Sequence, residues 1–240
     1  MNDKKARKKL FNIKFKEPET LRERIYFHLR EAIIHGYIPA GRRIIEKEIS
    51  QEFNVSITPV REAILQLSME GFVEIKTHKD IIVKQISLKE IGEIYEVQAV
   101  LEGLAGRLAV PNMHKEHLLK MEKLIEDMIK HFKSNNVDRF YEANEKMHEI
   151  YLKQSGHELV NSLISTLNLR KKMFRYRVTF LAKRDVMEKA IEDHKRILKG
   201  FLSRNPEEVE KIIIDHWTSD TRIKDFEIAM QNDLARKAQQ

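Results

Sequence analysis

Three histidines and one asparagine in the second half of the chain are the residues whose types could bind a metal ion. His148 follows Asn144 by four residues, so the two side chains share one face of a helix. His194 and His216 each lie in apolar surroundings on a different predicted helix. Three neutral imidazoles that converge inside a helical bundle suit a borderline divalent ion such as Zn²⁺, Ni²⁺ or Mn²⁺. Spacing alone does not show that they converge, and taken singly each histidine is more often a core or surface residue than a ligand.

A second set of chemistry-bearing residues opens a short helix in the first third of the chain. Residues 46–69 read as two short helices broken at Asn54-Val55. Ser56 stands where its side-chain oxygen caps the second helix, Thr58 follows it, and Arg61 lies one turn in. A helix that presents hydroxyls and an arginine at its N-terminus, backed by an apolar stripe, is built to enter a DNA major groove. The pattern predicts a helix-turn-helix.

The elements that position this pair of helices can be read from the apolar spacing around them. The stripe is formed by Ile45, Ile49 and Phe53 on the first helix and by Val60, Ile64 and Leu67 on the second. A helix over residues 19–35 precedes the pair. Gly71 ends the second helix, and residues 72–75 and 81–83 then predict a short β-hairpin, which is the wing of a winged helix.

Charge favours a polyanion as the partner of this part of the chain. The 240 residues carry a formal net charge of +7. Residues 1–85 contribute 17 Lys and Arg against 12 Asp and Glu, and the remainder is closer to neutral. Residues 1–17 are lysine-rich and predict a basic tail, which is either simply solvated or touches DNA phosphates without reading sequence.

Composition excludes several other classes of protein. The chain has no cysteine, which excludes disulfides and thiolate metal sites and fits a reducing cytoplasm. No apolar run approaches the roughly 18 residues of a membrane span. The basic N-terminus lacks a following apolar core, so we do not expect a secretory signal.

Everything after residue 86 reads as helical. Ser87 and Glu90 form a capping box that starts a new helix, and we place the domain boundary there. The predicted helices cover residues 88–109, 113–133, 136–153, 157–182, 185–199 and 206–234. Asn205 caps the last of them, and Pro206 occupies its first turn. We expect a mainly α fold: a basic tail (1–17), a winged helix-turn-helix (18–86) and an all-α bundle of six or seven helices (87–235).

With these residues in hand, the chain resembles a GntR-family transcriptional regulator of the FadR-type branch, which has an all-helical (FCD) ligand-binding domain. The matching segments, in order, are Leu21-Arg22-Glu23-Arg24-Ile25, Ile38-Pro39-Ala40-Gly41, Ser56-Ile57-Thr58-Pro59-Val60-Arg61-Glu62-Ala63 and Leu67-x-x-Glu70-Gly71-Phe72-Val73. Ile94-Tyr95-Glu96-Val97 and Leu101-Glu102 match the first helix of the family's second domain. The resemblance spans residues 19–225 and is stronger in the first third.

The resemblance implies which residues meet DNA. Arg61 corresponds to a position that contacts the operator, where an arginine can fork onto the O6 and N7 atoms of guanine. Ser56 and Thr58 beside it are expected to bind phosphates, and Lys47 matches a position that meets the DNA backbone. The family's wing tip usually holds glycines, and this chain has none there. Its wing contacts are therefore expected from His78 and Lys79. The alternative for Arg61 is a surface residue paired with Glu62 or Glu46.

The resemblance also implies a ligand set for the metal. Metal-binding members of the branch place an acid and three histidines at the positions of Asn144, His148, His194 and His216. The amide here is a neutral and weaker ligand than the acid. Two interpretations stay open: the site binds metal with three histidines and the Asn144 oxygen, or it has lost the metal and the histidines bind an effector directly.

Two further residues are candidates for binding an effector. Gln98 stands where many relatives carry an arginine that holds an effector carboxylate, and Arg175 on the helix 157–182 could turn inward to meet an anion. Asp193 and Asp215 directly precede two of the histidines. Because neighbouring side chains on a helix point about 100° apart, we do not expect these two acids to be metal ligands.

The sequence therefore predicts a homodimeric transcriptional regulator that binds a palindromic operator. A small-molecule effector, expected to be an organic acid, would bind near a metal in the helical domain and change the affinity for DNA. Two alternatives remain at this level. One is an architectural DNA-binding dimer without a ligand, and the other is a metal-dependent enzyme, for which we find no partnered general base near the histidines.

Overall fold

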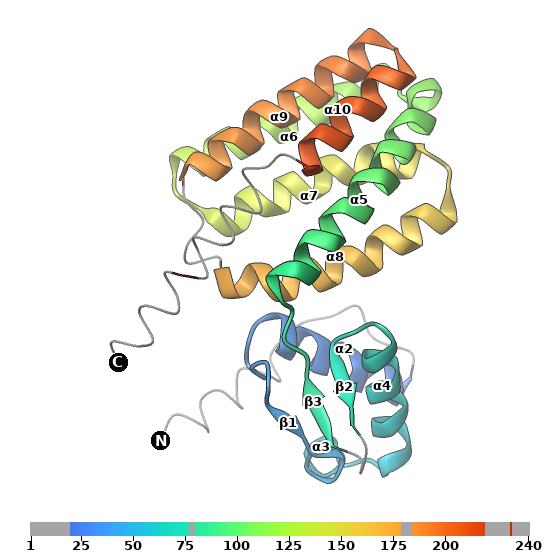
Figure 1. Cartoon of the computed structure of the whole chain (residues 1–240), viewed down its shortest axis with the longest axis vertical. Coiled ribbons are helices and arrows are strands. Elements are labelled where there is room, and N and C mark those ends of the chain that lie inside the picture. Colours follow the sequence, from blue (N-terminus) through green and yellow to red (C-terminus); the bar gives the residue numbers. More distant parts are fainter. Residues whose placement is uncertain (1–19, 77–79, 179–183, 219–230, 232–240) are drawn as a thin grey trace. The chain divides into compact units, whose positions relative to one another are not determined.

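The computed structural model describes residues 20–76, 80–178, 184–218 and Gln231, with the backbone alone for Leu88 and for residues 174–178. The predicted basic tail, the wing residues His78 and Lys79, and the predicted end of the last helix beyond residue 218 lie outside this description. The chain divides into two compact units, with Ser87 closing the N-terminal segment of the first and Leu88 opening the second (Figure 1).

The first unit combines three helices with a small antiparallel sheet. The helices are α2 (Leu21–Ile34), α3 (Glu46–Phe53) and α4 (Ile57–Met69). The strands are β1 (Arg43–Ile44), β2 (Val73–Ile75) and β3 (Ile81–Val83), in the order β1-β3-β2. Helix α4 packs against α2, α3 and β2. This is the predicted winged helix-turn-helix, and the hairpin of β2 and β3 is its wing.

The apolar stripe of α4 forms the centre of this unit. Val60, Ile64 and Leu67 are completely or almost completely buried, as the spacing predicts. The prediction for the preceding helix is less accurate, because Ile45 precedes α3 as its N-cap and is exposed. Sequence reasoning also missed β1, a two-residue strand that is too short to show a periodic pattern.

The turn between α3 and α4 depends on one residue in a left-handed conformation. Asn54 has φ 52° and ψ 50°, and its backbone N–H bonds back to the end of α3. Asparagine tolerates this region better than most residues do. The turn thus joins α3 to α4 through three residues.

The second unit is helical throughout its described residues. Its elements are α5 (Leu88–Ala109), a 3₁₀ turn η1 (Val110–Asn112), α6 (Lys115–Lys133), α7 (Val137–Gln154), α8 (Glu158–Val178), α9 (Arg184–Ser203) and α10 (Pro206–Thr218), except that Leu169–Arg177 of α8 is grouped with the first unit. The bundle of six helices confirms the predicted fold class. Most predicted ends agree within two residues, although α9 continues four residues further than predicted.

Five of these helices close into a ring. Helix α5 packs against α7 and α10, α6 packs against α7 and α9, and α9 packs against α10 (Figure 1). Side chains on the inner faces of this ring therefore meet, although their helices are far apart in the sequence. The caps predicted from sequence help to fix the ends: the Oδ1 atom of Asn205 accepts hydrogen bonds of 3.1 Å from the backbone N–H groups of Glu207 and Glu208.

Two glycines let α5 and α10 approach each other closely. A Cβ atom built on Gly106 would lie 2.2 Å from Cδ1 of Ile213, and one built on Gly103 would lie 2.7 Å from Cγ1 of Ile214. Ile213 is completely buried, so its end has no free space to move into. The close approach brings the last turns of α10 against the middle of α5.

We expect Gly106→Ala to lower the free energy of unfolding by about 1–2 kcal/mol. Alanine favours the helix by about 1 kcal/mol over glycine. The overpacking against Ile213 costs up to about 3 kcal/mol and outweighs that gain. Urea unfolding measures the change. Adding Ile213→Val removes the clashing Cδ1 atom, so the double variant should lose less than the sum of the single losses. A fully additive double variant would contradict this account.

Candidate metal centre and nucleic-acid interface

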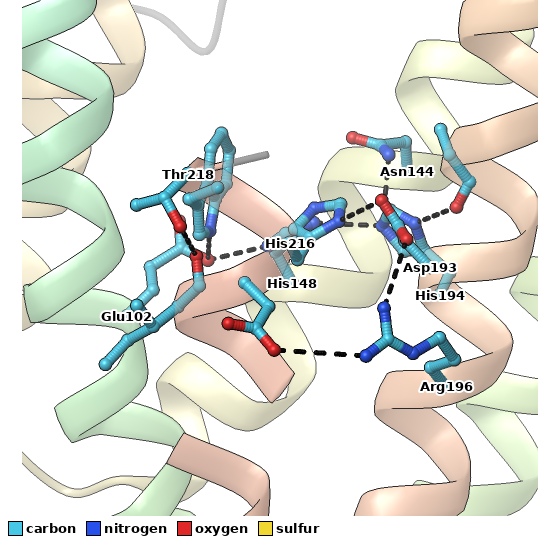
Figure 2. A network of polar contacts seen from close by, with 12 residues as sticks. Glu102, Asn144, His148, Asp193, His194, Arg196, His216 and Thr218 are labelled. Carbon is cyan, nitrogen blue, oxygen red and sulfur yellow. Dashed lines mark hydrogen bonds and ion pairs between the residues drawn. The ribbon is translucent and has the colours of Figure 1, made fainter. Parts of the chain in front are cut away.

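The three candidate histidines meet inside the ring of helices. His148 comes from α7, His194 from α9 and His216 from α10, and all three are buried. One ligand nitrogen from each lies within 4.8 Å of the others (Figure 2). The fold thus supplies the convergence that spacing alone did not show.

Each imidazole is held at its Nδ1 atom by an oxygen acceptor. Nδ1 of His148 lies 2.7 Å from Oε2 of Glu102, and Nδ1 of His216 lies 3.3 Å from Oδ2 of Asp193. Nδ1 of His194 lies 2.6 Å from the carbonyl oxygen of Ala190. Because carboxylates and carbonyls only accept, each Nδ1 is the N–H donor and each Nε2 keeps its lone pair. This arrangement is the one in which metal-binding histidines are usually fixed.

The Nε2 atoms of His148 and His194 need a positive centre between them. They lie 2.9 Å apart, and with both Nδ1 atoms protonated their lone pairs face each other. A shared proton or a metal ion removes this repulsion. Two nitrogens bound to one tetrahedral zinc are separated by roughly 3.3 Å, so a shift of a few tenths of an ångström accommodates the ion. The donor set therefore fits a divalent metal.

Asn144 lies beside this pair, one turn before His148 on α7. Its Nδ2 atom is 3.0 Å from Nε2 of His194 (Figure 2). The two ends of an amide group exchange places by a half-turn, so the same side chain can present Oδ1 to a metal ion. Asn144 is thus within reach as a fourth, neutral ligand.

Glu102 on α5 is the hub of the polar network, and sequence reasoning missed it as a site residue. It is completely buried. Besides His148, its carboxylate accepts hydrogen bonds from Trp217 Nε1 at 3.0 Å, from the hydroxyl of Tyr151 and from Nε2 of Gln98. Four donors from three helices compensate one buried charge. A lone carboxylate within the apolar stretch around it on α5 was the available signal.

The hydroxyl of Tyr151 stays a donor to this carboxylate. Burial, followed by the charge and hydrogen bond of Glu102, raises the pKa of the Tyr151 phenol well above its ordinary value. The phenol is therefore neutral across the physiological range. It lies 2.6 Å from Nδ1 of His148 and so helps to fix that ring as well.

Asp193 links the buried His216 to the more exposed Arg196. It is buried beside His216, and its carboxylate also lies 3.8 Å from the guanidinium of Arg196 (Figure 2). The same guanidinium lies 3.9 Å from the carboxylate of Asp215. Asp193 faces Nδ1 of His216 and leaves the ligand nitrogen of that ring to the centre.

The structure describes one of the two candidate effector residues. Gln98 is completely buried, and its Nε2 atom donates to Glu102 and to Oδ1 of Asn168 at 2.9 Å. Its Oε1 atom has no hydrogen-bond partner among the described residues. The side chain of Arg175 lies outside the described part of α8.

In the first unit, Arg61 points away from the core on α4. Its side chain is 56% exposed and forks onto Glu46 of α3, with both nitrogen–oxygen distances at 3.1 Å. This is the pairing that the sequence left open as an alternative, and it presents the guanidinium at the surface in a fixed orientation. Lys47 and Thr58 are also exposed.

The predicted capping bond of Ser56 is absent. Ser56 does occupy the N-cap position of α4, but its side chain makes no capping hydrogen bond. Its backbone is extended, with φ −67° and ψ 164°, as at other N-caps. The position was predicted correctly and the bond was not, because rotation of the side chain is not determined by residue type. The first-turn N–H groups of α4 thus receive no bond from this hydroxyl.

Among the described residues, no helix has both the length and the apolar character needed to cross a membrane.

Comparison with known proteins gives two family matches along the chain. Residues 21–83 match the model described as bacterial regulatory proteins, gntR family, and residues 93–219 match the FCD domain. The chain is 24% identical over 210 residues to the uncharacterized HTH-type transcriptional regulator YdhC of Bacillus subtilis (strain 168), covering 87% of this chain and 93% of that protein.

Two further similarities extend over most of the chain. The HTH-type transcriptional repressor RspR of Escherichia coli (strain K12) is 24% identical over 198 residues, which are 82% of this chain and 86% of that protein. The solved structure of E. coli McbR/YncC has a TM-score of 0.70 at 19% identity, covering 90% of this chain and 99% of that one. That structural likeness shows a shared fold.

We expect Glu102→Gln to destabilise the chain more than Tyr151→Phe does. Glutamine keeps the shape but turns an NH₂ group toward buried donors, which should cost about 3 kcal/mol. Phenylalanine removes one of four donors and should cost about 1 kcal/mol. Urea unfolding of both variants at pH 7 measures the two losses. Equal losses would mean that the carboxylate charge is not what holds the network together.

Proposed function

The chain belongs to the GntR family of bacterial regulatory proteins, in the FadR-type branch with an FCD domain, and we propose that its FCD domain binds a divalent metal together with an anionic effector. The chain is a DNA-binding transcriptional regulator. In this proposal the effector changes the affinity for operator DNA by preferring one arrangement of the helical unit over another.

One observation carries the metal proposal: each of the three buried imidazoles is held at Nδ1 by an oxygen acceptor. Any buried imidazole needs an acceptor for its N–H group, but among the described residues only here do three converging rings all use Nδ1 for that bond. Histidines that bind a metal require this orientation, because the second nitrogen must be unprotonated and correctly aimed. His148, His194 and His216 would hold the ion, and the oxygen of Asn144 would be the fourth ligand. The ion supplies a positive charge that an anion can bind.

A neutral ligand set favours an anionic effector. Three imidazoles and one amide leave the charge of a divalent ion uncancelled by its direct ligands. Open coordination positions would then accept a carboxylate or a similar oxygen donor. Gln98 and Arg175 stay candidates for contacting the remainder of the effector.

A binding role is also supported by the state of the two buried carboxylates. Glu102 and Asp193 both engage imidazole N–H groups. Neither is therefore placed as a general base for a metal-bound water. The curated relatives compared above are named as transcriptional regulators, so we propose no catalytic activity.

For DNA binding, we propose that a homodimer presents two copies of α4 to a palindromic operator. The exposed guanidinium of Arg61 would leave Glu46 and fork onto a guanine, with Ser56, Thr58 and Lys47 on the phosphates. His78 and Lys79 are proposed as wing contacts. The spacing of the half-sites would follow the two-fold axis of the dimer.

The single tryptophan gives a direct test of the metal proposal. Trp217 lies with its ring centroid 5.3 Å from that of His148 and 5.2 Å from that of His216, so its fluorescence should change when zinc binds. We expect Asn144→Asp to tighten zinc binding by about tenfold, because a carboxylate is a stronger ligand than an amide. His194→Ala should weaken it by at least the roughly 100-fold that loss of an outer partner can cost.

A matched control is His131→Ala, which removes a histidine from α6 and leaves the centre intact. Metal analysis of the dialysed protein provides the stoichiometry. A wild-type chain that retains no metal and shows no response of Trp217 to zinc, nickel or manganese would refute the metal proposal.

A second test concerns Arg61. We expect Arg61→Ala to abolish sequence preference, lowering operator affinity by about 10- to 100-fold while leaving weak, salt-sensitive binding to any duplex. Gel shifts with operator and scrambled duplexes at two salt concentrations measure both properties. Arg22→Ala removes the same charge from an exposed position on α2 and should keep the preference. If Arg61→Ala still preferred operator over scrambled duplex as strongly as the wild-type chain does, the role assigned to α4 would be refuted.

A further inference from the structure

The first residue of α4 is an exposed isoleucine. Ile57 has 41% of its surface accessible and stands between the exposed Ser56 and Thr58. Single exposed apolar side chains are common on proteins and by themselves mean little. What distinguishes Ile57 is its place at the N-terminal end of the helix that presents Arg61.

Ile57 lies outside the buried face of α4. The inward face of α4 is formed by Val60, Ala63, Ile64 and Leu67, all of them buried. An isoleucine also gives no electrostatic benefit at a helix N-terminus, where the first turn of α4 holds no acidic residue. Neither the buried stripe of α4 nor the electrostatics of its N-terminus therefore requires an apolar residue here.

Ile57 and Arg61 share one face of α4 because they are four residues apart. In the helix-turn-helix arrangement, the N-terminal residues of the second helix are the ones that reach base edges. One helical turn rises 5.4 Å and neighbouring base pairs are 3.4 Å apart, so the two side chains address positions within about two base pairs of each other.

We infer that Ile57 reads the 5-methyl group of a thymine close to the guanine that Arg61 reads. An isoleucine has no hydrogen-bond donor or acceptor in its side chain, so it contributes nothing to a phosphate contact. The thymine methyl is the apolar feature that the major groove offers, and aliphatic side chains contact it. The β-branched side chain is stiff, so little conformational freedom is lost on binding. This inference rests on the proposed role of α4 in reading DNA.

The test begins by selecting binding sequences from a random duplex pool with the full-length chain. Thymine should be enriched within two base pairs of the selected guanine. That thymine is then replaced by deoxyuridine, which removes the methyl group and leaves the hydrogen-bonding edge unchanged. We expect the Kd of the wild-type chain to rise about fourfold for each replacement, the value for one buried methyl group. Replacing a thymine elsewhere in the duplex should have no effect.

Variants assign the effect to the side chain. Ile57→Ala should bind the thymine and deoxyuridine duplexes equally, and Ile57→Val should keep most of the difference. Leu65→Ala is the matched control, because Leu65 is also exposed on α4 but lies two turns further along the helix. It should keep the full difference. Thermal melting confirms that the variants are folded.

Equal binding of both duplexes by the wild-type chain would overturn the inference, as would a deoxyuridine effect that persists in Ile57→Ala. Failure of the thymine contact can be told apart from failure of DNA reading by α4. If Arg61→Ala loses sequence preference and deoxyuridine has no effect, the role of α4 in reading DNA is supported and the thymine contact is refuted. If Arg61→Ala keeps its preference, or if no sequence is enriched, both fall.

Discussion

A carboxylate buried without access to water is the constraint on which the helical unit depends. Taking the charge of Glu102 out of water is costly unless it is fully hydrogen-bonded and balanced by a nearby positive charge. The donors come from α5, α7 and α10, so the charge is satisfied only when those helices are correctly placed. The same carboxylate orients His148. The packing of these helices and the geometry of the histidine centre therefore depend on the same hydrogen bonds.

The ring of helices brings these groups together through the close contact between α5 and α10. Gly103 and Gly106 let α10 approach α5, and this approach carries Trp217 to the carboxylate and His216 to the other two imidazoles. Bulkier residues on α5 would hold α10 away and leave Glu102 with fewer donors. The two glycines are therefore required for the geometry of the site, although they contribute no side chain to it.

The sequence predicts local features well and long-range ones poorly. Asn205 as a cap and Val60, Ile64 and Leu67 as a core stripe follow from residue types a few positions apart, and the structure has both. The meeting of three histidines from three helices was expected only through the family resemblance, since spacing carries no information on how distant helices pack. Glu102 and Asp193 were missed as members of the network for the same reason. The predicted capping bond of Ser56 was wrong because the rotation of one side chain about its χ1 bond does not follow from the sequence.

A count of the charges around the centre gives a physical reason for an amide, and not an acid, at position 144. Glu102 and Asp193 lie next to the centre as negative groups, Arg196 and Asp215 offset one another at its outer edge, and a divalent ion would cancel the two inner charges. With an acid in place of Asn144, the centre would already be negative before any effector arrived, and an anion would be repelled. With the amide, none of the ion's direct ligands is charged, and the two inner carboxylates only balance the ion, so an anion that binds the ion meets no excess negative charge. On this count the amide at position 144 supports the proposal that the centre holds a metal and binds an anionic effector.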